Sequence, residues 1–227
     1  MAGPEEKRRV AVLISGRGSN MASLIEAARA PDYPAEIALV VSNRPEAPGL
    51  ARAAAERIAT AIVDHRTYPE REAFERALDR ELRAHRAELL CLAGFMRILT
   101  PWFIDRWLGR MLNVHPSLLP LFRGLDTHRR ALEEGVRIHG CTVHFVTPEL
   151  DSGPIVAQAA VPVLPSDTEE TLAARVLAQE HVLYPLALRL VAGGRARLQQ
   201  GRVEVDADWD EGAALVSPSP ACGRGSG

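Results

Sequence analysis

Asn113 and His115 lie two residues apart, directly before a loop that contains Pro116 and Pro120. In an extended segment the side chains at i and i+2 point the same way, so the amide and the imidazole would face one point. Pro116 restricts His115 to extended geometry, and Pro120 closes the loop. An amide donor beside a titratable imidazole suits a carbonyl carbon that passes through a tetrahedral oxyanion. The alternative is a polar strand end followed by an ordinary loop.

Asp151 lies in a turn with Gly153 and two prolines, a composition that holds an irregular loop rigid. A carboxylate near His115 would favour the imidazolium, which is the better oxyanion partner and proton donor. In a parallel sheet, the end of the strand carrying Asn113 and this loop would both lie at the carboxyl edge, where ligands bind. The alternative is a turn-forming aspartate without a partner.

A glycine-rich loop, Ser15–Asn20, follows the apolar run 10–15 and precedes a helix that Ser19 or Asn20 would cap. Glycines let the backbone approach a ligand, and the helix N-terminus offers free N–H groups to an anion. Met21 occupies the position of the third glycine in the dinucleotide fingerprint, so the loop suggests a single phosphate. A tight turn with a helix cap is the alternative.

Two further segments are ambiguous. The apolar run 93–99 surrounds Arg97. This composition suits a pocket for a flat ring with polar edges, and the alternative is a core segment that carries a surface arginine. Glu180, in the final long helix, could hold a substrate ammonium or be a solvated helix charge.

Short apolar runs alternate with helical segments up to residue 110, which predicts a parallel sheet with right-handed crossovers. The runs 141–146 and 155–163 are joined by a turn and are predicted to be antiparallel. A long helix is expected at 168–190, with Ser166 or Asp167 as cap and Glu169 and Glu170 placed for a capping box. Short runs near Arg197 and Val203 predict a hairpin.

The expected fold is α/β and three-layered: a mostly parallel twisted sheet, antiparallel towards the C-terminus, with helices on both faces. Strands are further expected at 10–15, 37–41, 60–63, 89–93 and 111–114, and helices at 19–29, 48–57, 69–85 and 127–134.

The amino-acid composition limits the possible classes of protein and partner. Of 227 residues, 47% are hydrophobic and 25% charged, which favours one globular domain over residues 8–210, with a flexible N-terminus (1–7) and a disordered tail (211–227). The net charge of −2 argues against a nucleic-acid partner. Neither the three cysteines nor the scattered histidines have metal-site spacing, so no metal is expected. The N-terminus resembles neither a signal peptide nor a membrane span, which predicts a cytoplasmic protein.

Taken together and in this order, these segments resemble the phosphoribosylglycinamide formyltransferases, folate-dependent enzymes of purine (IMP) synthesis, over residues 8–200. Asn113, His115 and the Pro-Ser-Leu-Leu-Pro run resemble the wider group of folate formyltransferases and hydrolases. Within this group, the Ser15–Asn20 loop indicates an enzyme that acts on glycinamide ribonucleotide. Neither the C-terminal RNA-binding domain of methionyl-tRNA formyltransferases nor the N-terminal regulatory domain of formyltetrahydrofolate hydrolases is expected here.

The resemblance implies formyl transfer from 10-formyltetrahydrofolate to the amine of N1-(5-phospho-D-ribosyl)glycinamide. Both partners are small molecules, and the protein would be a monomer or homodimer. Catalysis is assigned to Asn113, His115 and Asp151. Substrate contacts are assigned to Gly18, Ser19 and Asn20 (phosphate) and to Glu180 (glycinamide). The residues expected to bind the co-substrate are Arg71, Met96, Arg97, Ile98, Leu99, Asn113, Thr147, Pro148, Glu149, Leu150 and Asp151.

One local departure and two other functions stay open. Asp126 stands where related sequences often have histidine, which leaves any role of Asp126 or His128 undecided. A 10-formyltetrahydrofolate hydrolase would use water in place of the amine, but it needs no phosphate loop. A folate- or nucleotide-binding module would keep the fold without the chemistry.

Overall fold

The computed structural model describes residues 6–205, and its centre is a seven-stranded sheet in the order β3-β2-β1-β4-β5-β6-β7. Parallel pairing joins the first five strands in this order, and β6 and β7 continue the sheet antiparallel. The predicted fold class is therefore confirmed. The strands are β1 (Arg8–Ile14), β2 (Ala35–Ser42), β3 (Thr60–Ile62), β4 (Leu89–Leu92), β5 (Met111–His115), β6 (Ile138–Phe145) and β7 (Ile155–Pro162). The predicted tail 211–227 lies outside the described residues.

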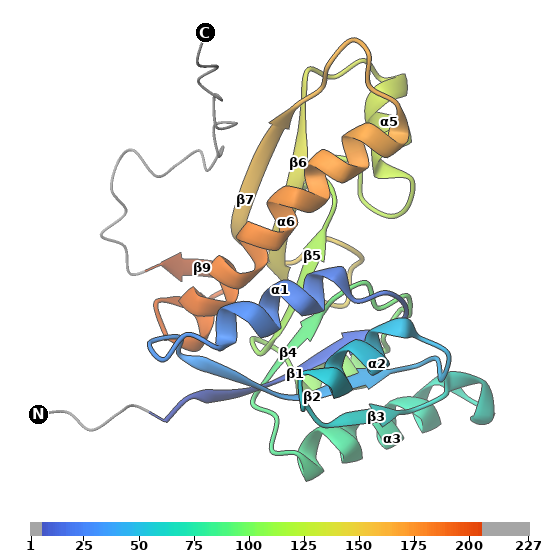
Figure 1. Ribbon diagram of the computed structural model, residues 1–227, viewed down its shortest axis with the longest axis vertical. Helices are drawn as coiled ribbons and strands as arrows, with labels where there is room; N and C mark the ends of the chain where they lie inside the picture. Colours follow the sequence, from blue (N-terminus) through green and yellow to red (C-terminus); the bar gives the residue numbers. More distant parts are fainter. Residues whose placement is uncertain (1–5, 206–227) are drawn as a thin grey trace, which may run out of the picture.

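Alternating side chains divide the interior into two cores, one on each side of the sheet. In β1, Val10, Val12 and Ile14 pack into the first core, whereas Ala11 and Leu13 pack into the second. The first core lies under α1 (Ser19–Ala28), α2 (Pro48–Ala55) and α6 (Glu169–Ala192), and α1 and α6 lie side by side in Figure 1. The second lies under α3 (Arg71–Ala84) and α4 (Pro101–Arg106). The remaining elements are the 3-10 turn η1 (His65–Thr67), α5 (Thr127–Glu133), and the predicted hairpin, β8 (Ala196–Gln199) with β9 (Arg202–Val205).

Two helix N-caps differ from expectation, and one helix was not expected. Gly18, at a left-handed φ of 68°, is the N-cap of α1, so neither Ser19 nor Asn20 caps it. Thr168 caps α6 and forms its capping box with Thr171, in place of the predicted Ser166 or Asp167 with a glutamate. Helix α4 was not predicted, although Thr100 as cap followed by proline is a helix-start signal.

The change of strand direction at β6 determines where the loop 146–154 begins. The Val146 N–H donates to the Met111 carbonyl at 2.9 Å, so the loop leaves the sheet beside the amino end of β5. The loop therefore does not begin at the carboxyl edge of the parallel strands, because β6 is antiparallel to β5. The loop instead reaches back to His115 over one face of the sheet.

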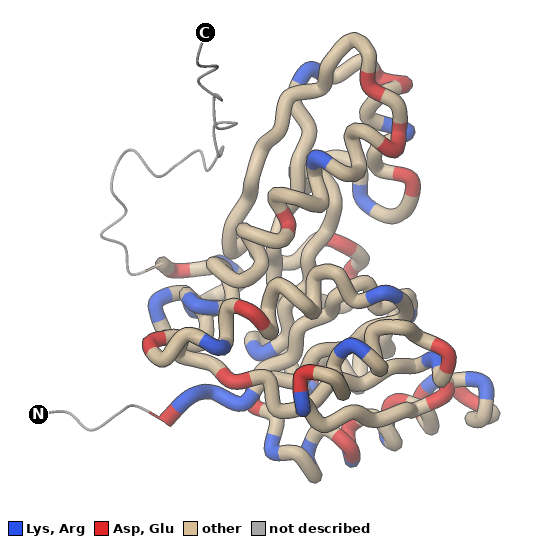
Figure 2. The backbone as a smooth tube through the Cα atoms, viewed as in Figure 1, with Lys and Arg blue, Asp and Glu red and all other residues tan. Residues whose placement is uncertain are grey.

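The charged residues are distributed without a large patch of one sign in the view of Figure 2. In the view of Figure 2, acidic and basic segments are interspersed. Among residues 6–205, no helix combines the length and apolar character needed to cross a membrane.

Candidate active site

Asn113 and His115 meet Asp151 and a further histidine, His144, on one face of the sheet. In the β5–β6 register Asn113 lies opposite His144. The His115 Nδ1 atom is 3.4 Å from Asp151 Oδ2, and His144 Nε2 is 3.9 Å from Asp151 Oδ1. Both imidazoles are buried, His115 at 5% exposure and His144 at 2%. The three residues assigned to catalysis are thus brought together.

The carbonyl of Phe122 fixes the orientation of the His115 ring and the position of one ring hydrogen. His115 Nε2 lies 2.9 Å from this carbonyl, which can only accept a hydrogen bond, so Nε2 carries hydrogen. The other ring nitrogen, Nδ1, is the atom that faces Asp151.

Asp151 is held by its backbone and by a neighbouring loop. Its φ is 48°, in the left-handed region where aspartate is tolerated better than most residues. Its Oδ2 atom accepts the Gly124 N–H at 2.9 Å, and its side chain is only 10% exposed. The loop that follows His115 is also fixed, since Thr142 donates to the Ser117 carbonyl at 2.7 Å and accepts the Leu119 N–H at 3.0 Å.

His144 is a site residue that the sequence reasoning missed. Its Nδ1 donates to the Phe145 carbonyl at 2.9 Å, so Nε2 is an acceptor and receives the Asn113 amide N–H at 3.3 Å. Burial lowers the pKa of His144, partly opposed by Asp151, which keeps it neutral near pH 7. The contact joins residues 31 positions apart through antiparallel pairing, and no local signal in the sequence marks it.

The predicted phosphate loop borders a cavity of about 270 Å³ at the end of β1. Arg17 and Arg44 line it beside the first turn of α1, so two basic residues and a helix N-terminus border the same space. Gly49 permits this close packing, because a Cβ there would lie 2.5 Å from Ile14 Cδ1 and 2.9 Å from the Gly16 carbonyl oxygen. The lining comprises Ser15, Gly16, Arg17, Gly18, Ser19, Asn20, Arg44, Ala93, Gly94 and Met96.

Glu180 is buried on α6 and accepts the Asn20 amide N–H at 2.6 Å, so the solvated-charge interpretation is wrong. Burial raises the pKa of Glu180, and the Asn20 hydrogen bond opposes that shift. Within the described residues, Asn20 Oδ1 and Gln179 Oε1 are buried without a hydrogen-bond partner. Buried polar atoms usually have a partner, so these two mark the surroundings of Glu180 as an unusual polar cluster.

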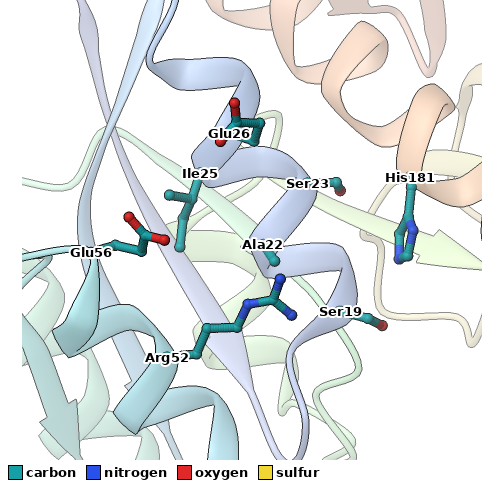
Figure 3. A pocket seen from close by; sticks show the side chains of 8 residues that line it. All are labelled: Ser19, Ala22, Ser23, Ile25, Glu26, Arg52, Glu56 and His181. Atoms are coloured by element: carbon teal, nitrogen blue, oxygen red, sulfur yellow. The ribbon is translucent and has the colours of Figure 1, made fainter.

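A second hollow of about 320 Å³ lies on the other side of Ser19, between α1, α2 and α6 (Figure 3). Arg52 and His181 reach towards Ser19 from the two flanking helices. The sequence reasoning gave neither residue a role: His181 was noted only as the neighbour of Glu180, and Arg52 lies in an alanine-rich helix without a motif. Burial, and then the Arg52 charge, lowers the pKa of His181. The hollow is lined by Ser19, Ala22, Ser23, Ile25, Glu26, Arg52, Glu56 and His181.

Apart from Arg71 at the start of α3 and Asn113 in β5, the residues assigned to the co-substrate form two stretches with exposed apolar side chains. Met96 and Ile98 are 66% and 64% exposed, while Leu99 is buried. In the loop 147–151, Leu150 is 56% exposed. Large apolar side chains exposed in this way are typical of ligand-binding surfaces.

Asp126 and His128 have separate surroundings. Asp126 is the left-handed N-cap of α5 and pairs with Arg129. His128 stacks edge-on against His139, with ring centroids 5.3 Å apart. Burial, and then the His115 charge, lowers the pKa of His128.

Comparison with known proteins agrees with this geometry. Residues 8–188 match the family described as "Formyl transferase". The phosphoribosylglycinamide formyltransferase of Escherichia coli (strain K12) is 44% identical over 206 residues, which cover 91% of this chain and 95% of the relative. The trifunctional purine biosynthetic protein adenosine-3 of Bos taurus is 48% identical over 87% of this chain. The chain spans only about a fifth of the length of the trifunctional relatives.

Solved structures give the same result. Glycinamide ribonucleotide transformylase 1 from Symbiobacterium toebii superposes with a TM-score of 0.85 at 46% identity, covering 88% of this chain and 94% of that one. The Brucella melitensis phosphoribosylglycinamide formyltransferase gives 0.80 at 55% identity, covering 83% and 97%. The chain belongs to the formyl transferase family. Within it, the chain groups with the phosphoribosylglycinamide formyltransferases, as the sequence predicted.

A deformylase is more distant. The formyltetrahydrofolate deformylase of Pseudomonas syringae pv. tomato shares the fold with a TM-score of 0.81, but it is 27% identical and the match covers 66% of its chain.

Proposed function

We propose that this chain transfers the formyl group of 10-formyltetrahydrofolate to the amine of N1-(5-phospho-D-ribosyl)glycinamide, giving the N-formyl product and tetrahydrofolate. The end-to-end similarity to enzymes of that name supports the proposal. The observation that carries the chemistry is the buried cluster in which Asp151 faces the Nδ1 atom of His115 while Asn113 is held by His144.

In this mechanism the neutral glycinamide amine attacks the formyl carbon on N10. The free Asn113 amide N–H donates to the oxyanion, the positive charge of protonated His115 stabilises it, and Asp151 supports the imidazolium. The bond from carbon to N10 then breaks, the amine loses a proton and N10 gains one, so Asp151 and His115 relay a proton without net change. No covalent enzyme intermediate is needed. Positioning the two bound substrates supplies much of the remaining acceleration.

The substrates would bind on either side of this cluster. Gly18, Ser19 and Asn20 bind the phosphate, with Arg17 and Arg44 balancing its charge, because these residues share one cavity. Glu180 contacts the glycinamide part. The segment 96–99 and the loop 147–151 bind the co-substrate, since these stretches expose apolar side chains, and Arg71 at the start of α3 adds a charged contact. No metal takes part in this scheme. The working unit is one domain, 8–210, acting in the cytoplasm as a monomer or homodimer.

The test is a two-substrate assay that follows tetrahydrofolate release from 10-formyltetrahydrofolate, with and without the ribonucleotide. Turnover that requires the ribonucleotide and collapses in His115→Ala is the expected result. Turnover without the ribonucleotide would instead identify a hydrolase. Binding of both ligands without turnover would identify a module that has lost the chemistry.

A further inference from the structure

The segment Met96–Leu99 lies between β4 and α4 and has no regular secondary structure. Phe95, directly before the segment, and Leu99, at its end, are buried, whereas Met96 and Ile98 are exposed. Because no strand ladder holds its backbone, its shape depends on hydrogen bonds made at its two ends.

The amino end of the segment is tied to the base of the phosphate loop. The Met96 N–H donates to Ser15 Oγ at 2.8 Å, and the Ser15 hydroxyl donates to Asn43 Oδ1 at 2.6 Å. Ser15 and Asn43 are both buried. The hydroxyl of Ser15 is thus oriented with its acceptor lone pair towards Met96.

The carboxyl end of the segment is tied to α3. Glu75 is fully buried and accepts the Thr100 N–H at 2.7 Å on one oxygen and the Thr100 hydroxyl on the other. Arg71 lies one turn earlier on α3, and its charge partly opposes the rise that burial causes in the pKa of Glu75. The same short stretch of α3 therefore carries Arg71 and the carboxylate that holds the segment.

We propose that Glu75 and Ser15 are positioning residues for the formyl donor: they hold the two ends of the segment so that Met96 and Ile98 form one wall of its ring pocket. This inference rests on the proposed function, because it takes the ligand of the segment to be the folate co-substrate. Neither residue needs to touch that ligand.

Asp79 provides a matched control. It lies one turn after Glu75 in α3, is buried, and accepts the Trp107 indole N–H at 3.1 Å while pairing with Arg83 and Arg106. It thereby braces the far end of α4. Removing either carboxylate should lower the melting temperature, but only the loss of Glu75 releases the segment.

The experiment compares steady-state constants and melting temperatures of Glu75→Ala, Asp79→Ala, Glu75→Gln and Ser15→Ala. Glu75→Ala should raise the KM for 10-formyltetrahydrofolate on the order of tenfold, with the ribonucleotide KM nearly unchanged. Ser15→Ala should shift the same constant in the same direction. Asp79→Ala should leave both constants unchanged. Glu75→Gln should restore the KM, because an amide can accept the Thr100 N–H and donate to its hydroxyl.

Equal effects of Glu75→Ala and Asp79→Ala on the folate KM, or no effect of Glu75→Ala, would overturn the inference. A failure of the wild-type chain to transfer formyl groups would count against the proposed function instead. In that event, direct titration with tetrahydrofolate still decides the inference, because wild type should bind it more tightly than Glu75→Ala while Asp79→Ala should match wild type.

Discussion

The amide nitrogen of Asn113 lies 3.3 Å from Nε2 of His144, and this contact determines which way the amide faces. The Nδ1 hydrogen of His144 is already donated to the Phe145 carbonyl, so Nε2 can only accept. One Asn113 N–H is therefore bound to His144, and the other is available in a fixed direction. An oxyanion donor that is oriented before the substrate arrives needs no rearrangement during the reaction.

Replacing Asn113 by alanine should remove this donor. We expect kcat to fall on the order of a hundredfold. The melting temperature should change little, because the side chain is partly exposed. Near-normal turnover would remove Asn113 from the mechanism.

Asp151→Asn keeps the shape of the side chain but not its charge. The amide oxygen can still accept the Gly124 N–H, so the loop should stay in place. We expect a large loss of kcat with both KM values nearly retained. If the KM values rise while kcat persists, Asp151 serves the loop rather than the reaction.

His144→Ala should act through Asn113. Without its acceptor the amide can rotate, and kcat should fall by about tenfold. A double-mutant cycle checks the coupling, since His144→Ala should cost little more in an Asn113→Ala background. Additive losses would mean that His144 acts independently.

Gly153→Ala should destabilise the protein and disturb the turn that carries Asp151. A Cβ at this position would lie 1.7 Å from the Phe145 carbonyl oxygen, so the backbone must move. We expect a loss of about 1–3 kcal/mol in the free energy of unfolding. Gly16→Ala is the control for stability alone, because nothing lies within 4 Å of its added Cβ.

His139 should make the stability of the protein sensitive to acid. Burial, and then the charge of His128, lowers the pKa of His139 to about 4. The unfolded chain takes up this proton near pH 6.5, so the unfolding free energy should fall as the pH drops from 6.5 towards 4. Denaturant titrations across this range should show a flatter dependence in His139→Leu. An unchanged slope would contradict the assignment.

The fold could be predicted because its signals are local. Apolar runs of strand length, such as those around Val12 and Cys91, alternate with helical segments, and the turn before Ile155 indicates the antiparallel pair. The predicted N-caps of α1 and α6 were wrong by a residue or two, because Gly18 and Thr168 have the cap geometry and the sequence does not show which of several neighbouring residues will adopt it.

The details of the site could not be predicted because they depend on register. His144 meets Asn113 only because β6 is antiparallel to β5 with those two residues opposite each other. The same reversal moves the start of the Asp151 loop to the amino end of β5. Arg52 and His181 come together through the packing of α2 and α6 about α1, and no spacing in the sequence records that packing.

The two cores on either side of the sheet have a consequence for how the protein would respond to each ligand. The phosphate loop leads into α1, above the core that includes Met21, whereas Leu99 belongs to the core beneath α3 and α4. Each ligand should therefore slow amide hydrogen exchange mainly in its own layer: the ribonucleotide in α1 and α6, and the folate in α3 and α4. The hydrogen bond from the Met96 N–H to the Ser15 hydroxyl links the two layers. If binding of one ligand also slows amide exchange in the other layer, that second effect should be smaller in Ser15→Ala.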